Sequence, residues 1–521
     1  FGLVLLLPVA RLPRRAAWLA PSTSSTGEGC RHHAAGTLPG ILTGASLSPH
    51  LGPSGTAAFE QRRSSRVNVA RFSFGAVLSM LSRFRVGVRS LGYIRYLAAL
   101  PFLTVAFLVR CFDYPSTVKR LIAEETDIVF SEEPIQPTEI PTRVYVSSNE
   151  ESPRKMPPVR WYVKTNTVYL RLLLQGELGL AESYMDGDWE ASNLEAFVFE
   201  MLRLENVKQK LGWLIWPLLC SVFFGEVKWK LSGGNSPRAS RENVASHYDD
   251  DRRRLYERML GPTMFYSCAY FKREGMTLDE AQLAKMRLVA EKLDLEPGMR
   301  VLDIGCGYGV LAQFLATEYG VTVRGVTQSA DQVKTAYNTF FHPNVKISLQ
   351  DYREVQGKYD RIVSIGMFEH VGSANYESFF KKCDDLLVKD GIMLLHTIGF
   401  RDNVKWSQDG FMNKYIFPGG EIPHLFHFSQ PFVTDSWHLE DLHSFGMSYA
   451  HTLRSWRTNI GDWKGLDEFD TRFRRMWNYY LACCSAAFVR RRTKLWQLVF
   501  TKSRSTRLDD CHHVRAAASK E

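Results

Sequence analysis

The chain has 521 residues, a formal net charge of +10 and nine cysteines. This length exceeds what one hydrophobic core usually serves, so a single small domain is excluded and we expect two folded units with extensions. The cysteines show no CxxC pair and no accompanying histidine pattern, so no metal site is expected. Their odd number argues against a complete disulfide framework and favours a reducing compartment.

Residues 1–112 form a basic leader that is poor in acidic residues. Glu28 and Glu60 are the only acids before Cys111, whereas arginine recurs along the whole segment. Such a composition resembles an organelle transit peptide, although a poorly defined end of the chain explains it equally well.

The leader ends in an apolar segment, residues 97–109. It is shorter than the roughly 20 residues that span a bilayer, and Pro101 interrupts it. An interfacial anchor flanked by Arg95 and Arg110 is one interpretation, and a buried helix is the other.

Residues 113–227 are expected to form a small mixed domain. Four prolines between residues 113 and 150 argue against a long helix there and favour a linker or short strands. Helical spacing follows at 170–178, and Asp186 and Gly187 indicate a turn. The tryptophan-rich apolar stretch 211–224 suits core packing or interfacial contact, and residues 228–245 are typical of a linker.

Residues 246–502 alternate between strand and helix patterns, ahead of a basic tail at 503–521. A helix ends at Pro297 and Gly298, and a buried strand then runs into a glycine-rich turn. The alternation predicts an α/β fold with a doubly wound, mostly parallel sheet, whose ligands bind at the carboxyl ends of the strands. The strands are expected at 299–305, 321–327, 345–351, 359–366 and 391–399, and the helices at 331–341 and 376–387.

The turn from Asp303 to Gly309 reads DIGCGYG, and its glycines let a ligand approach the backbone closely. A nicotinamide dinucleotide site is the alternative, but its fingerprint is GxGxxG with an acid about 20 residues later. Here the spacing is GxGxG, and the next strand ends in Gly325-Val326-Thr327-Gln328-Ser329 without an acid. A dehydrogenase is therefore disfavoured.

At this point the sequence resembles class I methyltransferases, which implies an S-adenosylmethionine cofactor. The resemblance places Asp351 where it can accept a hydrogen bond from an adenine amino group, although a strand-end turn residue is the plainer interpretation. Aromatic faces at Tyr248 and Tyr266 would suit a sulfonium ion. The implied cofactor residues are Tyr248, Tyr266, Ser267, Asp303, Gly305, Gly307, Gly309, Thr327, Gln332, Gln350, Asp351 and Tyr352.

Ordered matches over residues 162–502 sharpen this to a resemblance to cyclopropane-fatty-acyl-phospholipid synthases, whose catalytic domain carries a seven-stranded Rossmann-like sheet. Many ordered matches are more specific than one motif. They are GELGLAESYMDGDWE from 176, HYD from 247, PTMFYSCAYF from 262, VLDIGCGYG from 301, GVTQSADQ from 325, QDYRE from 350, DRIVSIGMFEHVG from 360, LLHTIG from 394, NKYIFPGG from 413 and FGMSY from 445.

The resemblance implies that an acyl-chain alkene attacks the sulfonium methyl and that a bound bicarbonate ion then removes a proton to close the ring. The implied bicarbonate ligands are Cys268, Glu369, His396, Ile398 and Tyr449. Each has a plainer interpretation. Cys268, His396 and Tyr449 would suit a core, and Glu369 with His370 would suit a helix cap. His370 is taken as a supporting or helix-start residue.

The chain departs from the family pattern after His247-Tyr248-Asp249, where it reads Asp250-Asp251-Arg252-Arg253-Arg254. In the family this segment closes over the cofactor and the acyl entrance. Two alternatives therefore stand beside the synthase. One is a relative that methylates an amine or leaves a methyl branch, and the other is an inactive membrane-binding relative.

The expected partner is unsaturated phospholipid in a bilayer, reached by peripheral contact that includes the domain at 113–227. A basic protein gains roughly 1 kcal/mol per Lys or Arg near anionic lipid, although Arg490-Arg491-Arg492 would also suit a solvated face. No nucleic-acid-binding motif is present, and a homodimer stays open. The expected location is membrane-associated in a reducing compartment, either cytoplasmic or mitochondrial.

Overall fold

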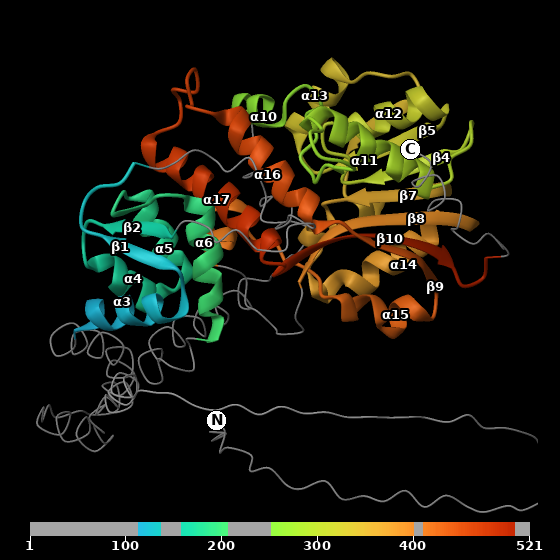
Figure 1. Cartoon of the computed structure of the whole chain (residues 1–521). Coiled ribbons are helices and arrows are strands. Elements are labelled where there is room, and N and C mark those ends of the chain that lie inside the picture. Colours follow the sequence, from blue (N-terminus) through green and yellow to red (C-terminus); the bar gives the residue numbers. More distant parts are fainter. Residues whose placement is uncertain (1–112, 137–157, 207–251, 401–409, 506–521) are drawn as a thin grey trace, which may run out of the picture. The chain divides into compact units, whose positions relative to one another are not determined.

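The computed structural model describes residues 113–136, 158–206, 252–400 and 410–505 (Figure 1). The predicted leader at 1–112, the apolar stretch 211–224 and the linker 228–245 lie outside the described residues. Within the described ranges, no helix is both long and apolar enough to cross a membrane. The described residues belong to one compact unit of the chain.

A small α+β layer precedes the larger sheet. Its strands lie in the order β1-β2-β3, with β2 parallel to β1 and antiparallel to β3. Trp161 and Trp189 project from β2 and β3 into a core that also holds Tyr169 and Phe197, and all four side chains are fully buried. The elements are α3 (Tyr114–Glu125), β1 (Ile128–Ser131), β2 (Val159–Val163), α4 (Thr167–Gln175), α5 (Glu177–Met185), β3 (Trp189–Ala191), α6 (Leu194–Met201) and the 3-10 turn Leu202–Asn206.

The prolines after residue 113 predicted that no long helix forms there. This prediction is wrong for residues 114–125. Helix α3 runs over 12 residues, with Asp113 as its N-cap and Pro115 in its first turn. Proline is tolerated there because the first helical N–H groups have no partner within the helix. The short strand β1 follows, as predicted.

The larger sheet has seven strands in the order β6-β5-β4-β7-β8-β10-β9. The first five are parallel, and β10 runs antiparallel to both β8 and β9. The predicted fold class is confirmed. The strands are β4 (Arg300–Ile304), β5 (Thr322–Thr327), β6 (Val345–Leu349), β7 (Tyr359–Ile365), β8 (Leu387–Phe400), β9 (Trp437–Ser444) and β10 (Thr493–Lys502).

Helices cover both faces of this sheet because its strand residues alternate between two cores. Val301 packs in one core with Val289 and Leu315, whereas Leu302 packs in the other with Phe379. Figure 1 shows the corresponding helices above and below the strands. They are α11 (Leu278–Lys292), α12 (Val310–Tyr319), α13 (Ala330–Thr339), α14 (Tyr376–Leu386) and α15 (Pro431–Thr434).

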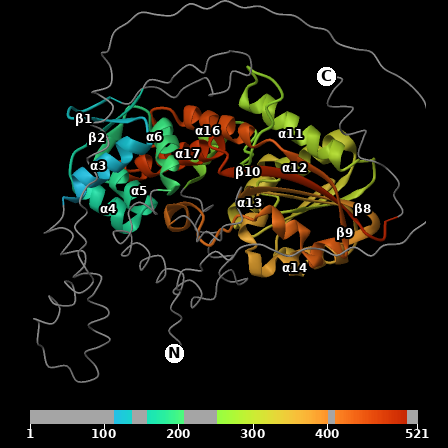
Figure 2. The same ribbon diagram turned by 60° about the horizontal axis from the view of Figure 1, so that its bottom comes forward.

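Three further helices link the two layers: α10 (Arg253–Leu260), α16 (Gly446–Ile460) and α17 (Thr471–Val489). Helix α17 packs against α5 and α6 of the small layer, and Figure 2 shows α16 and α17 beside α6. Arg454 of α16 donates to the Glu195 carboxylate at 3.0 Å, and Ser485 Oγ donates to the same group at 2.9 Å. These buried hydrogen bonds to Glu195 fix the small layer to the helices that border the site.

Candidate active site

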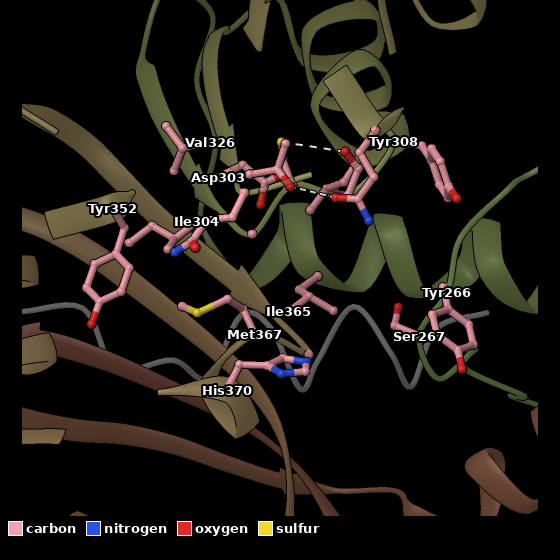
Figure 3. Close-up of a pocket in the computed structure, with 18 of the residues that line it drawn as sticks. Tyr266, Ser267, Asp303, Ile304, Tyr308, Val326, Tyr352, Ile365, Met367 and His370 are labelled. Atoms are coloured by element: carbon pink, nitrogen blue, oxygen red, sulfur yellow. Dashed lines mark hydrogen bonds between the residues drawn. The ribbon is translucent and has the colours of Figure 1, made fainter. Parts of the chain in front are cut away.

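A pocket opens at the carboxyl ends of β4, β5 and β7, where the glycine-rich turn meets the first turn of α12. The space within the pocket and its open mouth together is about 1160 Å³. Figure 3 shows Ser267 and Tyr352 at opposite ends, with His370 between them. Nine predicted cofactor residues line it: Tyr266, Ser267, Asp303, Gly305, Gly307, Thr327, Gln332, Gln350 and Tyr352.

The glycine turn forms a cradle that side chains would fill. Gly305 has φ +81°, and a Cβ built there would lie 2.6 Å from Cβ of Met367. Gly307 also has positive φ, a backbone conformation that L-residues rarely adopt. The space that these two glycines leave open lies at the amino terminus of α12, whose N-cap Gly309 is itself outside the pocket lining.

Asp303 is the last residue but one of β4, beneath this cradle, and is 2 % exposed. Its Oδ2 atom is buried without a hydrogen-bond partner within the described ranges. Burial raises the pKa of Asp303 to about 7, although the charge of Lys285 acts in the opposite direction. An acceptor held free at a pocket wall fits a ligand that carries N–H or O–H donors.

The wall formed by residues 264–267 is aromatic and firmly held. Tyr266 packs on Trp456 at 5.1 Å between ring centroids, and its hydroxyl lies 2.9 Å from that of Tyr480. Ser267 Oγ accepts a hydrogen bond from Lys285 Nζ at 2.7 Å. Tyr248, the other predicted aromatic contact, lies outside the described residues.

The opposite end of the pocket is lined mainly by polar side chains. Thr327 Oγ1 donates to Gln332 Oε1 at 2.6 Å, which orients the Gln332 amide. Gln350 Oε1 accepts from Arg324 at 2.8 Å. Tyr352 follows on a 3-10 turn and is 7 % exposed.

Asp351 is not part of the pocket lining, and its carboxylate is already engaged. Arg353 binds it in a bidentate fork at 2.8 and 2.6 Å, and Gln328 Nε2 donates to it at 3.1 Å. Asp351 also caps the turn that begins at Tyr352. Asp351 therefore takes the position of a turn residue at the end of a strand. Gln328 and Arg353 line the pocket in its place.

Glu369 lies on a 3-10 turn after β7, and one of its carboxylate oxygens is fixed. Oε1 accepts from the backbone N–H of Ile398 at 2.7 Å, so two of the predicted anion ligands meet directly. Oε2 is buried without a hydrogen-bond partner in the described ranges. Burial raises the pKa of Glu369 to about 7, while the bond from Ile398 acts against the rise.

His396 lies on the neighbouring strand β8 and is 1 % exposed. Gln497 Nε2 donates to its Nδ1 at 3.2 Å, and Nε2 has no partner among the described residues. Burial and the nearby charges of Lys285 and Lys292 hold the pKa of His396 well below its usual range. The ring is therefore neutral, and its free nitrogen can meet a small polar ligand.

The remaining predicted anion ligands, Cys268 and Tyr449, lie outside the pocket lining, as do Glu369, His396 and Ile398. Cys268 is fully buried, its thiol donates to the Ala269 carbonyl at 3.1 Å, and burial raises its pKa. Tyr449 of α16 stacks on Phe488 at 4.6 Å and meets the edge of Trp456. The thiol of Cys268 is thus no nucleophile at neutral pH.

The segment that departs from the family pattern is described from Arg252 onward. It begins α10, in which Arg254 donates to the Gly465 carbonyl at 2.6 Å and Arg258 donates to that of Asn459 at 3.2 Å. Tyr256 of this helix packs on Tyr266 at 5.2 Å. The arginines therefore hold α10 beside the pocket wall, while Asp250 and Asp251 lie outside the described residues.

Sequence reasoning missed His370 as a pocket residue. It closes the turn Phe368–His370 and lines the pocket, and burial lowers its pKa to about 4, so the ring is neutral. Its position directly after β7, at the binding edge of a parallel sheet, is the signal that indicates it. Other lining residues not predicted are Met264, Phe265, Ile304, Cys306, Tyr308, Val310, Leu311, Val326, Gln328, Arg353, Ile365, Gly366, Met367 and Val371.

The sheet order and the glycine turn at the end of β4 define a class I S-adenosylmethionine-dependent methyltransferase. The family model for mycolic acid cyclopropane synthetase matches residues 235–498. The cyclopropane-fatty-acyl-phospholipid synthase of Escherichia coli (strain K12) is 42 % identical over 344 residues, which cover 65 % of this chain and 87 % of that protein. The chain belongs to the mycolic acid cyclopropane synthetase family.

Two further similarities each extend over about half of the chain. Cyclopropane mycolic acid synthase 2 of Mycobacterium bovis is 35 % identical over 301 residues, which cover 52 % of this chain and 98 % of that protein. The solved structure of the cyclopropane synthase MmaA2 from Mycobacterium tuberculosis is 32 % identical. It covers 50 % of this chain and 97 % of its own, with a TM-score of 0.47.

Proposed function

We propose that the chain adds a methylene to the double bond of unsaturated phospholipid acyl chains and closes it to a cyclopropane, with bound bicarbonate as the base. The observation that carries the proposal is the pair of buried atoms without partners, Glu369 Oε2 and His396 Nε2, on the turn after β7 and on β8. Support for the substrate comes from the name of the Escherichia coli relative.

The pocket residues suit S-adenosylmethionine. Asp303 Oδ2 is free to accept from the amino group of its methionine portion, and Gly305 and Gly307 leave room for its chain. The aromatic face of Tyr266 favours a sulfonium cation. When bound, this cofactor supplies an electrophilic methyl group.

The wall residues orient the acyl chain and exclude water. An alkene is a weak nucleophile, so positioning and an apolar surface must lower the barrier. Phe265, Tyr266 and Ile365 provide such a surface within the lining. Water would otherwise capture the cation formed on the acyl chain.

Glu369 and His396 can hold a small anion without adding charge. A glutamate whose pKa lies at about 7 is partly protonated at neutral pH, and Oε2–H can then donate to the anion while Oε1 stays fixed by Ile398. The neutral ring of His396 can donate from Nε2 because Gln497 donates to its Nδ1. The anion takes the proton that leaves the former methyl group, and the ring closes as that C–H bond breaks.

The substrate lies in a bilayer, so we also propose that the chain works at a membrane surface. The net charge of +10 favours contact with anionic lipid. Membrane contact and the reducing compartment stay predictions.

The test uses the full chain with vesicles of unsaturated phospholipid, S-adenosylmethionine and bicarbonate. We expect released fatty acids to gain the mass of one CH₂ group, and turnover to fall in buffer depleted of CO₂ and bicarbonate. Unchanged mass spectra would contradict the substrate. Turnover that is independent of bicarbonate would contradict the base.

A further inference from the structure

Lys285 of α11 is a buried lysine to which the proposed mechanism assigns no role. Its side chain is fully buried, which is rare for lysine unless an anion pairs with it. Among the described residues no carboxylate lies within ion-pair distance of Lys285. Lys292, which is also buried on α11, differs because its ammonium lies 2.9 Å from Asp441.

The ammonium of Lys285 points at the loop that carries Cys268. Nζ donates to Ser267 Oγ at 2.7 Å and lies 2.9 Å from the centroid of the Phe265 ring. Gln282, one turn earlier on α11, donates from Nε2 to the carbonyls of Phe265 and Ser267 at 3.1 and 3.0 Å. One face of α11 therefore fixes this loop with three hydrogen bonds.

Helix α16 holds the same loop from its other end. Thr452 Oγ1 accepts from the backbone N–H of Ala269 at 3.0 Å, and Ser448 Oγ accepts from that of Phe271 at 3.3 Å. Tyr449 lies on this helix next to Ser448. The two helices thus determine where the Cys268 backbone stands relative to the rest of the site.

The charge of Lys285 also reaches the groups around the proposed anion. Its positive charge acts to lower the pKa of Cys268, Asp303 and His396. For Cys268 and Asp303 burial outweighs this effect, so the net pKa of each is raised. Burial in turn lowers the pKa of Lys285 itself, while the charges of Cys268 and Asp303 oppose that change. An anion that enters this region would favour the charged form of Lys285, so anion binding and protonation of Lys285 would support each other.

We propose that Lys285 is a positioning residue for the bound anion: it supplies the compensating positive charge and, through Ser267, fixes the loop that ends in Cys268. The inference rests on the proposed function, because it assumes that a small anion binds between Cys268, Glu369 and His396. A buried anion beside the Glu369 carboxyl is strongly disfavoured unless a cation offsets its loss of hydration.

The test measures turnover against bicarbonate concentration in the full-length chain, at saturating S-adenosylmethionine, for wild type and for Lys285→Met, Lys285→Gln and Lys292→Met. Met keeps the aliphatic length, and Gln keeps a donor for Ser267 without the charge. We expect both Lys285 variants to need about tenfold more bicarbonate for half-maximal turnover, the loss typical of one charge-assisted hydrogen bond. Turnover should recover at high bicarbonate.

The control Lys292→Met removes a second buried lysine of the same helix, which also acts on the pKa of His396 but pairs with Asp441 rather than with the loop before Cys268. We expect it to lower the melting temperature while keeping the bicarbonate requirement within about twofold of wild type. Wild-type bicarbonate dependence in Lys285→Met, or its restoration in Lys285→Gln, would overturn the inference alone. Wild-type turnover without bicarbonate dependence would instead contradict the proposed base, and the inference with it. If Lys285→Met does not fold, Lys285→Gln against Lys292→Met decides the question.

Discussion

The two halves of the site are built by different physical means. The cofactor half is an open pocket shaped by the backbone of Gly305 and Gly307, with the buried carboxyl of Asp303 at its base and amides and hydroxyls along its walls. The other half consists of the titratable side chains Glu369, His396 and Lys285, and within the described ranges Glu369 Oε2 and His396 Nε2 are buried without hydrogen-bond partners. Substitutions that fill space should therefore impair the cofactor half. Substitutions that remove a charge or a titratable proton should impair the other half.

The largest expected effect is on turnover, through the half of the site that holds Glu369 and His396. Cofactor binding in the other half should be unaffected. Glu369→Gln keeps the shape of the side chain and an N–H donor, but an amide proton cannot shift toward the anion as the Oε2–H proton can, so turnover should fall by roughly 10²–10⁴-fold. The affinity for S-adenosylmethionine, measured by titration calorimetry, should stay unchanged. Glu421→Gln is the matched control, because the Glu421 carboxylate accepts from the Ser373 N–H and its loss should barely change turnover. Full activity in Glu369→Gln would contradict the role.

A smaller effect concerns the dependence of stability on pH. Burial holds the pKa of Glu369 at about 7 in the fold, above its ordinary value of 4.5. Between these two values the folded chain keeps a proton that the unfolded chain releases, so this group makes the fold less stable as the pH rises. Above pH 7, Glu369→Gln should gain on the order of 1–3 kcal/mol in free energy of unfolding relative to wild type. Parallel pH curves from denaturant titrations would refute this.

The smallest effect acts on the cofactor half alone. In Gly305→Ala the new Cβ would lie 2.6 Å from Cβ of Met367 at a positive φ, so affinity for S-adenosylmethionine should fall about tenfold. Gly357→Ala is the control, because it has the same type of strained φ of +104° but no atom within 4 Å of the added Cβ. It should lower stability without altering cofactor binding. Equal cofactor affinities for the two variants would remove the distinction between the halves.

The cofactor half could be predicted from sequence because one short turn determines it. The residues from Asp303 to Gly307 follow a buried strand directly, and parallel strands bring Thr327 and Gln350 to the same edge of the sheet. Asp351 was predicted to contact the cofactor but lies outside the pocket lining. Arg353, two residues later, is close enough to bind its carboxylate. Only the local turn geometry decides between such a contact and a ligand.

The other half depends on packing between distant segments. Glu369 meets Ile398 across 29 positions, and Lys285 reaches Ser267 from a separate helix. Neither contact has a local pattern. The family resemblance supplied Glu369, Ile398 and Ser267, whereas Lys285 was found only from the structure. Helix α3 shows the same limit on a smaller scale, because Pro115 marks a helix start as readily as an interruption.

The central claim is that a base in this site removes one proton from the transferred methyl group. S-adenosylmethionine with a fully deuterated methyl group tests it directly in the vesicle reaction. Ring closure predicts fatty acids that retain two of the three deuterons. Products that retain all three deuterons would show transfer without ring closure and would contradict the account.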